Sequence, residues 1–381
     1  MSLPTVIEED HFSPWGSETL YNTGEAYFDS LVADIESARY SIDLESYIFA
    51  RDAVGGRVAQ ALIDAHRRGL RVRVLMDAVG CYDSSDYYAG LLEAAGVEVK
   101  IFHPLPWQIH HYHRSPTTGS WLDKALHFIS RINQRDHRKL CVIDCTHLWS
   151  GSFNISAVHL APENGGEGWR DYGLCVGGPV VEELNQNFDA LWSRGNIKLG
   201  KGLFRLYWDN LGRLARRRRN QLLLQHIDNA RDHIWIVSAY FSPAVSIVKA
   251  LANARRRQVD VKLIVPAHSD ISLLPFLTAT YYADLLNAGV KVYEYQPAMI
   301  HAKAVIIDDL HLIGSTNFNH RSFLHDLELD IQLHLPDSKQ TLRQWFMQDI
   351  KDSIEVTAKS HRYSFTARLI GWCAKLIRYW V

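Results

Sequence analysis

The chain has 381 residues, which suits two domains of about 100–200 residues each. Its composition, with 47% apolar and 22% charged residues, is that of a globular protein and excludes a disordered chain, a collagen and a small disulfide-rich scaffold. Lys and Arg total 41 against 42 Asp and Glu, a formal charge of −1, which argues against a uniformly basic protein that coats nucleic acid.

The N-terminus and the cysteines indicate the cellular compartment of the protein. The first ten residues are acidic and contain no apolar core, so no signal peptide is predicted. No stretch approaches the ~18 uncharged apolar residues that cross a bilayer. The five cysteines form no C-x-x-C pair, and the apolar flanks of Cys141 and Cys145 favour buried thiols over a zinc site. We expect a reducing compartment and a protein that is soluble or lies on a membrane surface.

Helices and strands alternate along the first half. A helix is predicted at 27–38, a strand at 41–49, a second helix at 56–68 and an alternating strand at 70–77. Strands that alternate with helices form βαβ units, so the sequence predicts an α/β fold with a parallel or mixed sheet covered by helices.

An internal repeat divides the chain. ESARYSIDLESYIF at 36–49 is similar to DNARDHIWIVSAYF at 228–241, and LLEAAGVEV at 91–99 is similar to LLNAGVKV at 285–292. The two landmarks are offset by 192 and 193 positions, which indicates duplicated domains. We expect a first domain at 1–192, a basic linker at 193–220, a second domain at 221–360 and a C-terminal tail at 361–381.

The first half carries an insertion before its motif. His137 and His301 are 164 positions apart instead of 193, so 29 extra residues lie between 99 and 137. WLDKALHFISRI at 121–132 has a helical apolar stripe and is predicted to form a flap that suits acyl chains, or to pack on its own domain. The histidines at 110, 111 and 113 resemble a metal cluster, but no metal is expected because surface histidine clusters are often incidental.

Matching motifs with the spacing H-x-K-x4-D, each followed by Gly-Ser-x-Asn, occur once in each half. In a strand, residues i and i+2 share a face, so each histidine points the same way as its lysine. Each aspartate is seven positions past its histidine and falls on the opposite face, which favours a structural role in binding nearby backbone over a functional one. The motif residues are His137, Lys139, Asp144, Ser152 and Asn154, then His301, Lys303, Asp308, Ser315 and Asn317.

A histidine and a lysine from each half, with two asparagine amides, suit a phosphodiester. Lysines neutralise the non-bridging oxygens, and amides donate hydrogen bonds to them. One imidazole can attack phosphorus while the other protonates the leaving oxygen. Histidines that only fill a core are a weaker interpretation, because each of the two is matched by a lysine on the same face.

Each histidine is expected to have an acid that orients it. WRDYGLCVGG at 169–178 offers Asp171. LHDLELDIQLHL at 324–335 offers Asp326, Glu328 and Asp330 on one strand face. We predict Glu328, with Asp326 as the alternative; a second interpretation is an edge strand with an acidic solvent face.

Two segments have the character of membrane-binding elements. The predicted linker carries nine Lys/Arg against one acid, interleaved with Trp208 and leucines, and the tail SFTARLIGWCAKLIRYWV is cationic and amphipathic. We hypothesise that both lie on anionic bilayers. The alternatives are a solvated charged helix for the linker and packing against its own domain for the tail.

The paired motifs resemble those of the phospholipase D superfamily. NQRDHRKLCVID and RSFLHDLELD are most similar to its bacterial cardiolipin synthase branch. The resemblance implies two αβα domains related by a pseudo-two-fold axis, with the active site at their interface and a phosphohistidine intermediate that needs no metal or cofactor. By the family pattern, His137 is the nucleophile and His301 the general acid. The remaining implied roles are phosphate binding by Lys139, Lys303, Asn154 and Asn317, and orientation of the imidazoles by Asp171 and Glu328.

The sequence departs from that branch in three places. It lacks two membrane-spanning helices, has GSFN where GGxN is common, and has Asp326 where Asn is usual. The resemblance implies a phosphatidyltransferase that makes cardiolipin from phosphatidylglycerol, peripheral on the cytoplasmic side of the bacterial inner membrane. The alternatives are a phospholipase D that releases phosphatidate, and a metal-independent phosphodiesterase or nuclease. The neutral charge argues against nucleic acid as a partner, and the intact motifs argue against an inactive scaffold.

Overall fold

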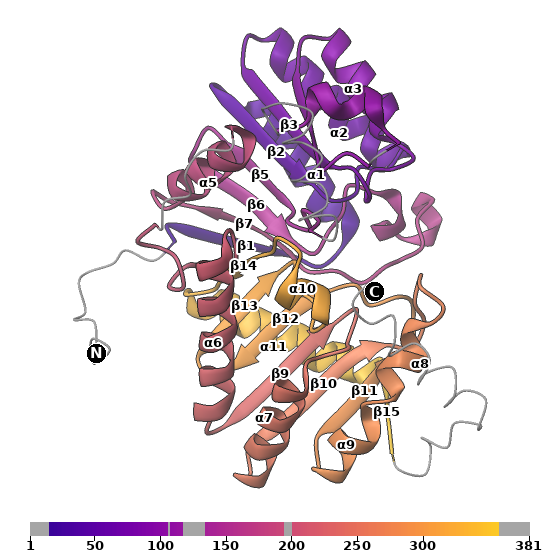
Figure 1. Ribbon diagram of the computed structural model, residues 1–381, viewed down its shortest axis with the longest axis vertical. Coiled ribbons are helices and arrows are strands. Elements are labelled where there is room, and N and C mark those ends of the chain that lie inside the picture. The colour runs from indigo at the N-terminus through magenta and orange to yellow at the C-terminus, as the bar shows by residue number, and fades with distance from the viewer. Residues whose placement is uncertain (1–14, 106, 117–133, 194–199, 358–381) are drawn as a thin grey trace.

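The computed structural model describes residues 15–105, 107–116, 134–193 and 200–357, and shows two α/β domains stacked along the long axis (Figure 1). The predicted two-domain α/β class is confirmed. The predicted flap at 121–132 and the tail at 361–381 lie outside the described residues. In the part of the chain that is described, no helix is both long enough and apolar enough to cross a bilayer.

The first domain is built on a seven-stranded sheet in the order β1-β7-β6-β5-β2-β3-β4. Strands β2, β3 and β4 are parallel, and the other pairs are antiparallel. The strands are β1 Ser17–Tyr21, β2 Ser41–Ser46, β3 Arg71–Asp77, β4 Glu98–Phe102, β5 Leu140–Ile143, β6 His147–Gly151 and β7 Gly173–Gly177. The helices are α1 Gly24–Ser37, α2 Ala53–Arg67, α3 Ser85–Ala94 and α5 Val181–Ser193.

The second domain has an eight-stranded sheet in the order β15-β11-β10-β9-β12-β13-β14-β8. Its strands are β8 Tyr207–Asp209, β9 His233–Ser238, β10 Asp260–Pro266, β11 Lys291–Tyr295, β12 Lys303–Ile307, β13 Leu310–Gly314, β14 Leu329–Gln332 and β15 Ser353–Glu355. Its helices are α6 Arg213–Asn229, α7 Val245–Arg256, α8 Leu274–Ala279, α9 Tyr282–Asn287, α10 His320–Leu324 and α11 Pro336–Lys351.

The two sheets repeat one topology. The order β4-β3-β2-β5-β6-β7-β1 matches β11-β10-β9-β12-β13-β14-β8, and only β15 is additional. Strand β8, the counterpart of β1, and the first turns of α6 come from 193–220, the predicted basic linker. Within that segment Arg219 is buried and pairs with Asp330 at 2.8 Å, so part of the basic charge stabilises the second domain instead of facing solvent.

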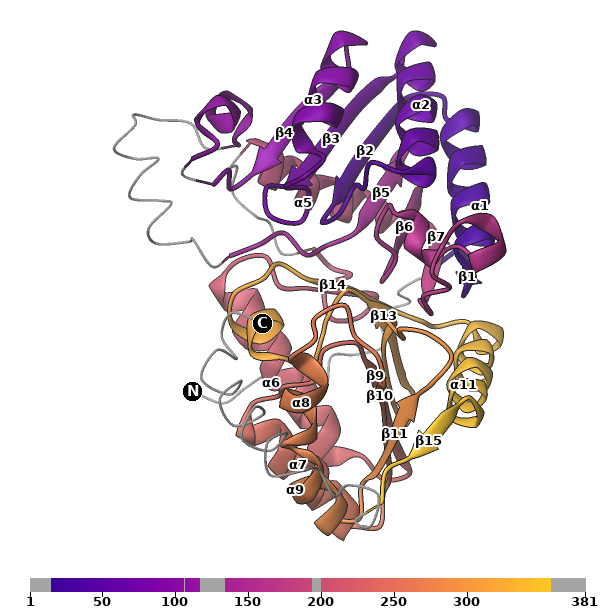
Figure 2. The same cartoon turned by 90° about the vertical axis from the view of Figure 1, so that its right-hand side faces the viewer.

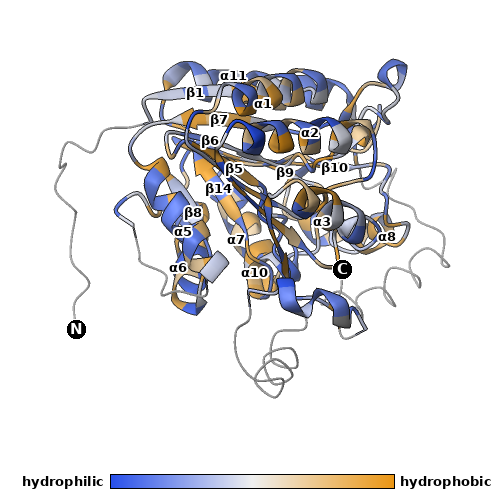
Figure 3. Cartoon of the chain, turned by 90° about the horizontal axis from the view of Figure 1, so that it is seen from above, coloured by the Kyte–Doolittle hydropathy of each residue, from blue (hydrophilic) through white to orange (hydrophobic). Residues whose placement is uncertain are grey.

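The domains share one apolar core. Strands from both sheets meet in a single cluster that includes Leu140, Val142, Ile313 and Leu329, while α1–α3 and α6–α9 cover the outer faces (Figures 1 and 2). Figure 3 shows hydrophobic residues along strands such as β5 and β14, and hydrophilic residues on α5 and α6. Burial of so much apolar surface between the sheets holds the halves in one orientation.

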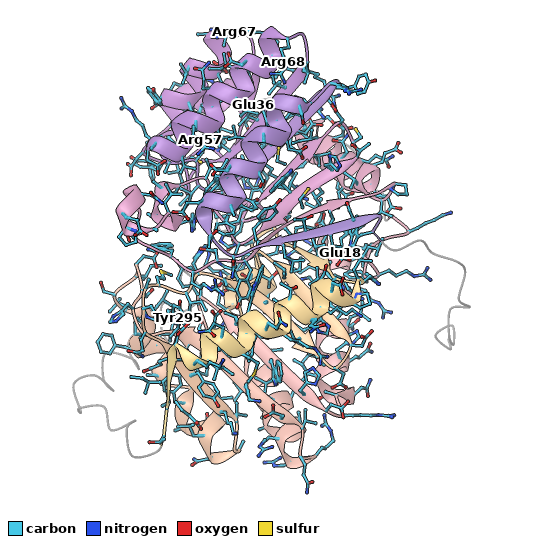
Figure 4. All side chains as sticks on the ribbon, turned by 180° about the vertical axis from the view of Figure 1, so that it is seen from behind. Glu18, Glu36, Arg57, Arg67, Arg68 and Tyr295 are labelled. Atoms are coloured by element: carbon cyan, nitrogen blue, oxygen red, sulfur yellow. The ribbon has the colours of Figure 1, made fainter. Side chains whose placement is uncertain are left out.

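Polar contacts also join the halves. Arg138 is fully buried and donates to Glu45 on β2 at 2.7 Å and to Asp209 on β8 at 3.1 Å. Glu18 on β1, labelled in Figure 4, accepts the backbone N–H of His334 at 2.8 Å, just before α11 begins. Buried bidentate arginine pairs fix orientation because an unpaired charge there is costly.

The motif aspartates close two equivalent turns. Asp144 accepts the backbone N–H groups of residues 39–41 at 2.7–2.9 Å, and Asp308 accepts those of residues 231–233 at 2.9–3.0 Å. Both have left-handed backbones, with φ of 53° and 48°. Asx residues tolerate this region better than most others. Each aspartate therefore ties its hairpin to the start of the neighbouring strand, away from the histidines.

Asp308→Ala should lower the free energy of unfolding by about 1–3 kcal/mol, because three N–H groups lose a charged acceptor and alanine adopts the left-handed backbone less readily than aspartate. Urea denaturation measures the change. Asp309→Ala is the matched control. The Asp309 side chain is 93% exposed and forms only a surface ion pair with Lys339. Its loss should lower the free energy of unfolding by under about 1 kcal/mol. Equal losses in the two variants would contradict a special structural role for Asp308.

Candidate active site

Short backbone bridges between the domains position both motif histidines. The N–H of His137 donates to the carbonyl of Leu327 at 3.0 Å, and the N–H of His301 donates to the carbonyl of Arg170 at 2.8 Å. Residues 327 and 170 each immediately precede a predicted acid, and each lies in the domain opposite to its histidine. The bridges thus align each imidazole with a carboxylate from the other half.

Each of the two predicted acids contacts a motif imidazole of the other domain. Glu328 lies 3.0 Å from Nδ1 of His137, and Asp171 lies 2.9 Å from Nδ1 of His301. Both carboxylates are fully buried. Asp326, the alternative acid, instead pairs with Arg321 at 2.9 Å. In each pair the carboxylate accepts Nδ1–H, which leaves Nε2 for the chemistry.

The two acids have different neighbours. Glu328 accepts the hydroxyls of Ser315 and Ser322. Ser152, the counterpart of Ser315, bonds instead to the backbone of Tyr172 at 3.0 and 3.1 Å, beside Asp171. Burial raises the pKa of Glu328. Burial acts the same way on Asp171, but the His301 and His159 imidazoles hold its pKa well below the usual value.

Both motif lysines are buried, and each contacts its own motif histidine. Lys139 Nζ donates to the carbonyl of His137 at 2.8 Å, whereas Lys303 Nζ lies 2.7 Å from Nε2 of His301 and also binds that residue's carbonyl. Burial lowers the pKa of Lys139 to about 8 and that of Lys303 to about 7, although the nearby carboxylates oppose the effect. Burial and these lysines also lower the pKa of both histidines.

The imidazoles and the asparagines meet at one cavity of about 600 Å³. Asn317 Oδ1 accepts the N–H of Tyr240 at 3.2 Å, while the buried Oδ1 of Asn154 has no hydrogen-bond partner among the described residues. A buried polar atom without a partner is a candidate contact for a ligand. The structure therefore brings His137, His301, Asn154 and Asn317 to one cavity. Lys139 and Lys303 are not among the residues that line it, and each binds the carbonyl of its own motif histidine.

The glycine of each Gly-Ser-x-Asn motif makes room for the strand that carries the acid. A Cβ at Gly151 would lie 2.5 Å from the carbonyl of Tyr172, and one at Gly314 would lie 2.3 Å from the carbonyl of Leu329. Gly151 also has a φ of 132°, which side chains rarely adopt. The motif glycine thus lies where its strand pairs antiparallel with the strand that follows the acid.

Several residues of the cavity were not predicted from the sequence. Tyr47 and Trp169 pack against His137 and His301, with ring centroids 4.8 and 5.5 Å apart. Arg321 and Tyr240 also line the cavity. A signal existed for the tyrosines, because SYIF and SAYF lie in the repeated segment, but an aromatic residue in a strand is also typical of core.

The described part of the histidine-rich insertion places His110 and His111 beside Asp86. Among the described residues, Asp86, His110 and His111 form the one group whose possible ligand atoms lie within 4.8 Å of one another. Arg114 approaches Nδ1 of His111 at 3.1 Å, and a guanidinium can only donate. Nε2 of His111 therefore keeps its proton and faces Asp86 at 3.1 Å as a donor, not as a ligand.

The lysine pKa values predict how anion binding depends on pH. Both pKa values lie below the usual 10.5, so in the empty site Lys303 loses its proton above pH of about 7 and Lys139 above about 8. An anion binds the protonated form, and its affinity should therefore fall as pH rises, by about tenfold per unit above pH 8 for each lysine. Sulfate keeps a constant charge over this range, and calorimetric titration at pH 6.5, 8 and 9 measures the effect. An affinity that is flat across this range would contradict the charge assignment.

Comparison with known proteins identifies the family of the chain. The sequence profile described as "Cardiolipin synthase, PLD-like domain" matches residues 31–192 and 223–350. A cardiolipin synthase of Geobacillus kaustophilus is 31% identical over 352 residues, 86% of this chain and 65% of its own length. Cardiolipin synthase 2 of Bacillus anthracis is 31% identical over 377 residues, 95% of this chain and 70% of its own length. The chain thus spans about two thirds of the length of these relatives.

A solved structure shows the same fold. Phosphatidylserine synthase of Haemophilus influenzae superposes with a TM-score of 0.67 at 13% identity, and the match covers 94% of this chain and 92% of that one. At this identity the likeness concerns the arrangement of the two domains. It agrees with the pairing of the sheets described above.

Proposed function

Because the chain belongs to the phospholipase D-like cardiolipin synthase family, we propose that it transfers a phosphatidyl group from phosphatidylglycerol to a second lipid alcohol through a phosphohistidine, forming cardiolipin. The sequence-based identification of the superfamily, and of an enzyme of the phosphatidyltransferase type, is confirmed at the level of the family. The observation that carries the specific proposal is the pair of buried imidazole–carboxylate contacts at one cavity.

In the first step, Nε2 of His137 attacks phosphorus and the bond to the leaving glycerol oxygen breaks. His301 gives that oxygen a proton from Nε2. In the second step the acceptor hydroxyl returns a proton to His301, its oxygen attacks phosphorus, and the P–N bond breaks. Lys139, Lys303 and the asparagines stabilise the charge on the non-bridging oxygens.

The surroundings of Nε2 support this division of roles. His137 lines the cavity, and within the described residues its Nε2 forms no hydrogen bond, which leaves this atom available for attack. Nε2 of His301 lies 2.7 Å from Lys303 Nζ. That ammonium can hand the imidazole a proton before the leaving oxygen needs one, which suits a general acid.

The histidine roles can be tested with asparagine substitutions, since an Asn amide can still donate to the acid but has no Nε2. We expect His137→Asn and His301→Asn each to lower turnover of phosphatidylglycerol by at least ~10²-fold. With a p-nitrophenyl phosphodiester, whose leaving group needs no proton, His301→Asn should still accumulate a phosphorylated protein by mass spectrometry. His137→Asn should not. A phosphorylated His137→Asn protein would contradict the assignment of the nucleophile.

The reaction products distinguish a transferase from a hydrolase and from a nuclease. Incubation with phosphatidylglycerol vesicles should yield cardiolipin and glycerol at a rate that EDTA leaves unchanged. Phosphatidate instead would identify a hydrolase built from the same residues, and an inert lipid with cleaved DNA would identify a nuclease. Either result would overturn the proposed transfer.

We also propose that the chain lies peripherally on an anionic membrane, on the cytoplasmic side in a bacterium. Val79 follows β3 and Ile271 follows β10, the equivalent strand of the other half; both line the cavity and are 39% and 38% exposed. Exposed arginines at 213, 217 and 218 on α6 lie near the end of α10, because Arg216 binds the carbonyl of Leu324 at 2.6 Å. Exposed apolar side chains at the cavity and cationic side chains on α6 each suit contact with an anionic bilayer surface.

Replacing Val79 and Ile271 together with serine should weaken binding to phosphatidylglycerol vesicles about tenfold, because two apolar side chains no longer enter the interface. Co-sedimentation measures the bound fraction. Ile354→Ser is the control, since Ile354 is 59% exposed on β15, on the side of α11 and away from α3 and α8 (Figure 2). Equal effects of both changes would argue against Val79 and Ile271 as part of the docking surface.

A further inference from the structure

A third buried histidine lies beside the site and belongs to neither motif. His159 is 2% exposed, and its Nδ1 lies 2.7 Å from Oδ2 of Asp171, the acid whose Oδ1 contacts His301. The ring stands edge-on to Trp169, which also packs against His301. One carboxylate thus serves two imidazoles.

Hydrogen bonding on the other side of the ring sets its tautomer. The backbone N–H of Asn154 points at Nε2 of His159 at 3.2 Å, so this nitrogen accepts and the proton of the neutral ring is on Nδ1. Nδ1–H then faces Oδ2 of Asp171. The alignment is poorer than that of a good hydrogen bond, since neither atom has a well-directed partner, but at 2.7 Å the donor and the charge still attract.

The second half uses a different residue at the equivalent place. His159 is five positions after Asn154, and Ser322 is five positions after Asn317. Ser322 accepts the backbone N–H of Asn317 at 3.3 Å and donates to Glu328 at 2.5 Å. Both side chains therefore accept from the asparagine backbone and face the acid, but one is an imidazole and the other a hydroxyl.

We infer that His159 is a positioning residue that holds Asp171 and the Asn154 loop against His301, and that it makes the two acid–imidazole pairs of the site unequal. This inference rests on the proposed function. Because Nδ1–H of His159 takes up part of the carboxylate charge, Asp171 stabilises a proton on His301 less than an unshared carboxylate would. His301 consequently releases its proton more readily to a leaving oxygen.

Other ionisable groups face the Asp171 carboxylate and enter any pH dependence. Lys303 at the start of β12 and Lys139 just before β5 are amines whose pKa values burial lowers, while Tyr27 on α1 and Tyr240 after β9 are phenols whose pKa values burial raises. None of these groups changes when residue 159 is replaced. A shift confined to His301 therefore reports on the contact between His159 and Asp171.

Two isosteric variants separate the contacts of His159. His159→Asn places an amide N–H near the position of Nδ1 and keeps the donor to Asp171. His159→Gln places its amide near the position of Nε2 and keeps only the acceptor for Asn154. We expect His159→Gln to lower kcat at least about tenfold with KM within about twofold, and its alkaline limb in kcat to move to higher pH. His159→Asn should retain most of the wild-type kcat and profile.

A readout that does not depend on turnover is the titration of the His301 ring, followed by NMR with ¹⁵N-labelled histidine in the full-length protein. The His301 pKa should be higher in His159→Gln than in wild type or His159→Asn. Equal His301 titration in all three proteins would overturn the inference, and so would equal loss of kcat in both variants. If the wild-type protein does not act on phosphatidylglycerol but the titration shifts as expected, the proposed function fails while the positioning role stands.

Discussion

The site depends on an exchange of partners between two domains: each half supplies the imidazole for the other half's carboxylate. A carboxylate or an imidazolium buried alone carries a large desolvation penalty, and the pairing His137–Glu328 and His301–Asp171 reduces it. The backbone bridges at residues 327 and 170 set the register of both pairs. Neither domain contains a complete pair, so docking of the halves and assembly of the site are one event.

Charge balance explains why this centre suits an anion. Two buried lysines lie among two buried carboxylates, and burial depresses the lysine and histidine pKa values in the empty site. A phosphodiester adds one negative charge, which favours protonated lysines and one imidazolium. An anion in the cavity therefore strengthens proton binding at these groups.

Duplication produced two similar sheets, and the sites on them have since become chemically unequal. The strand order, the turn-closing aspartates and the motif glycines are equivalent in the two halves. The acids are not: Asp171 faces a second imidazole, whereas Glu328 faces two hydroxyls. A nucleophile and a general acid need different proton affinities, so an asymmetric environment on a symmetric scaffold suits a reaction in which the two histidines do different things.

The sequence by itself determined the duplicated α/β class, the paired motifs and the histidines and asparagines that the structure brings to one cavity, because strand alternation and motif spacing can be read directly from the chain. It also indicated that Asp144 and Asp308 face away from the histidines. Only the tertiary structure decided that segment 207–220 completes the second domain, that Glu328 and not Asp326 contacts His137, and that His159 shares Asp171. The first two depend on contacts between distant segments, and the alternation of Asp326, Glu328 and Asp330 on one strand face does not reveal which of them contacts an imidazole of the other domain. The third depends on how the loop after Asn154 folds back on Asp171.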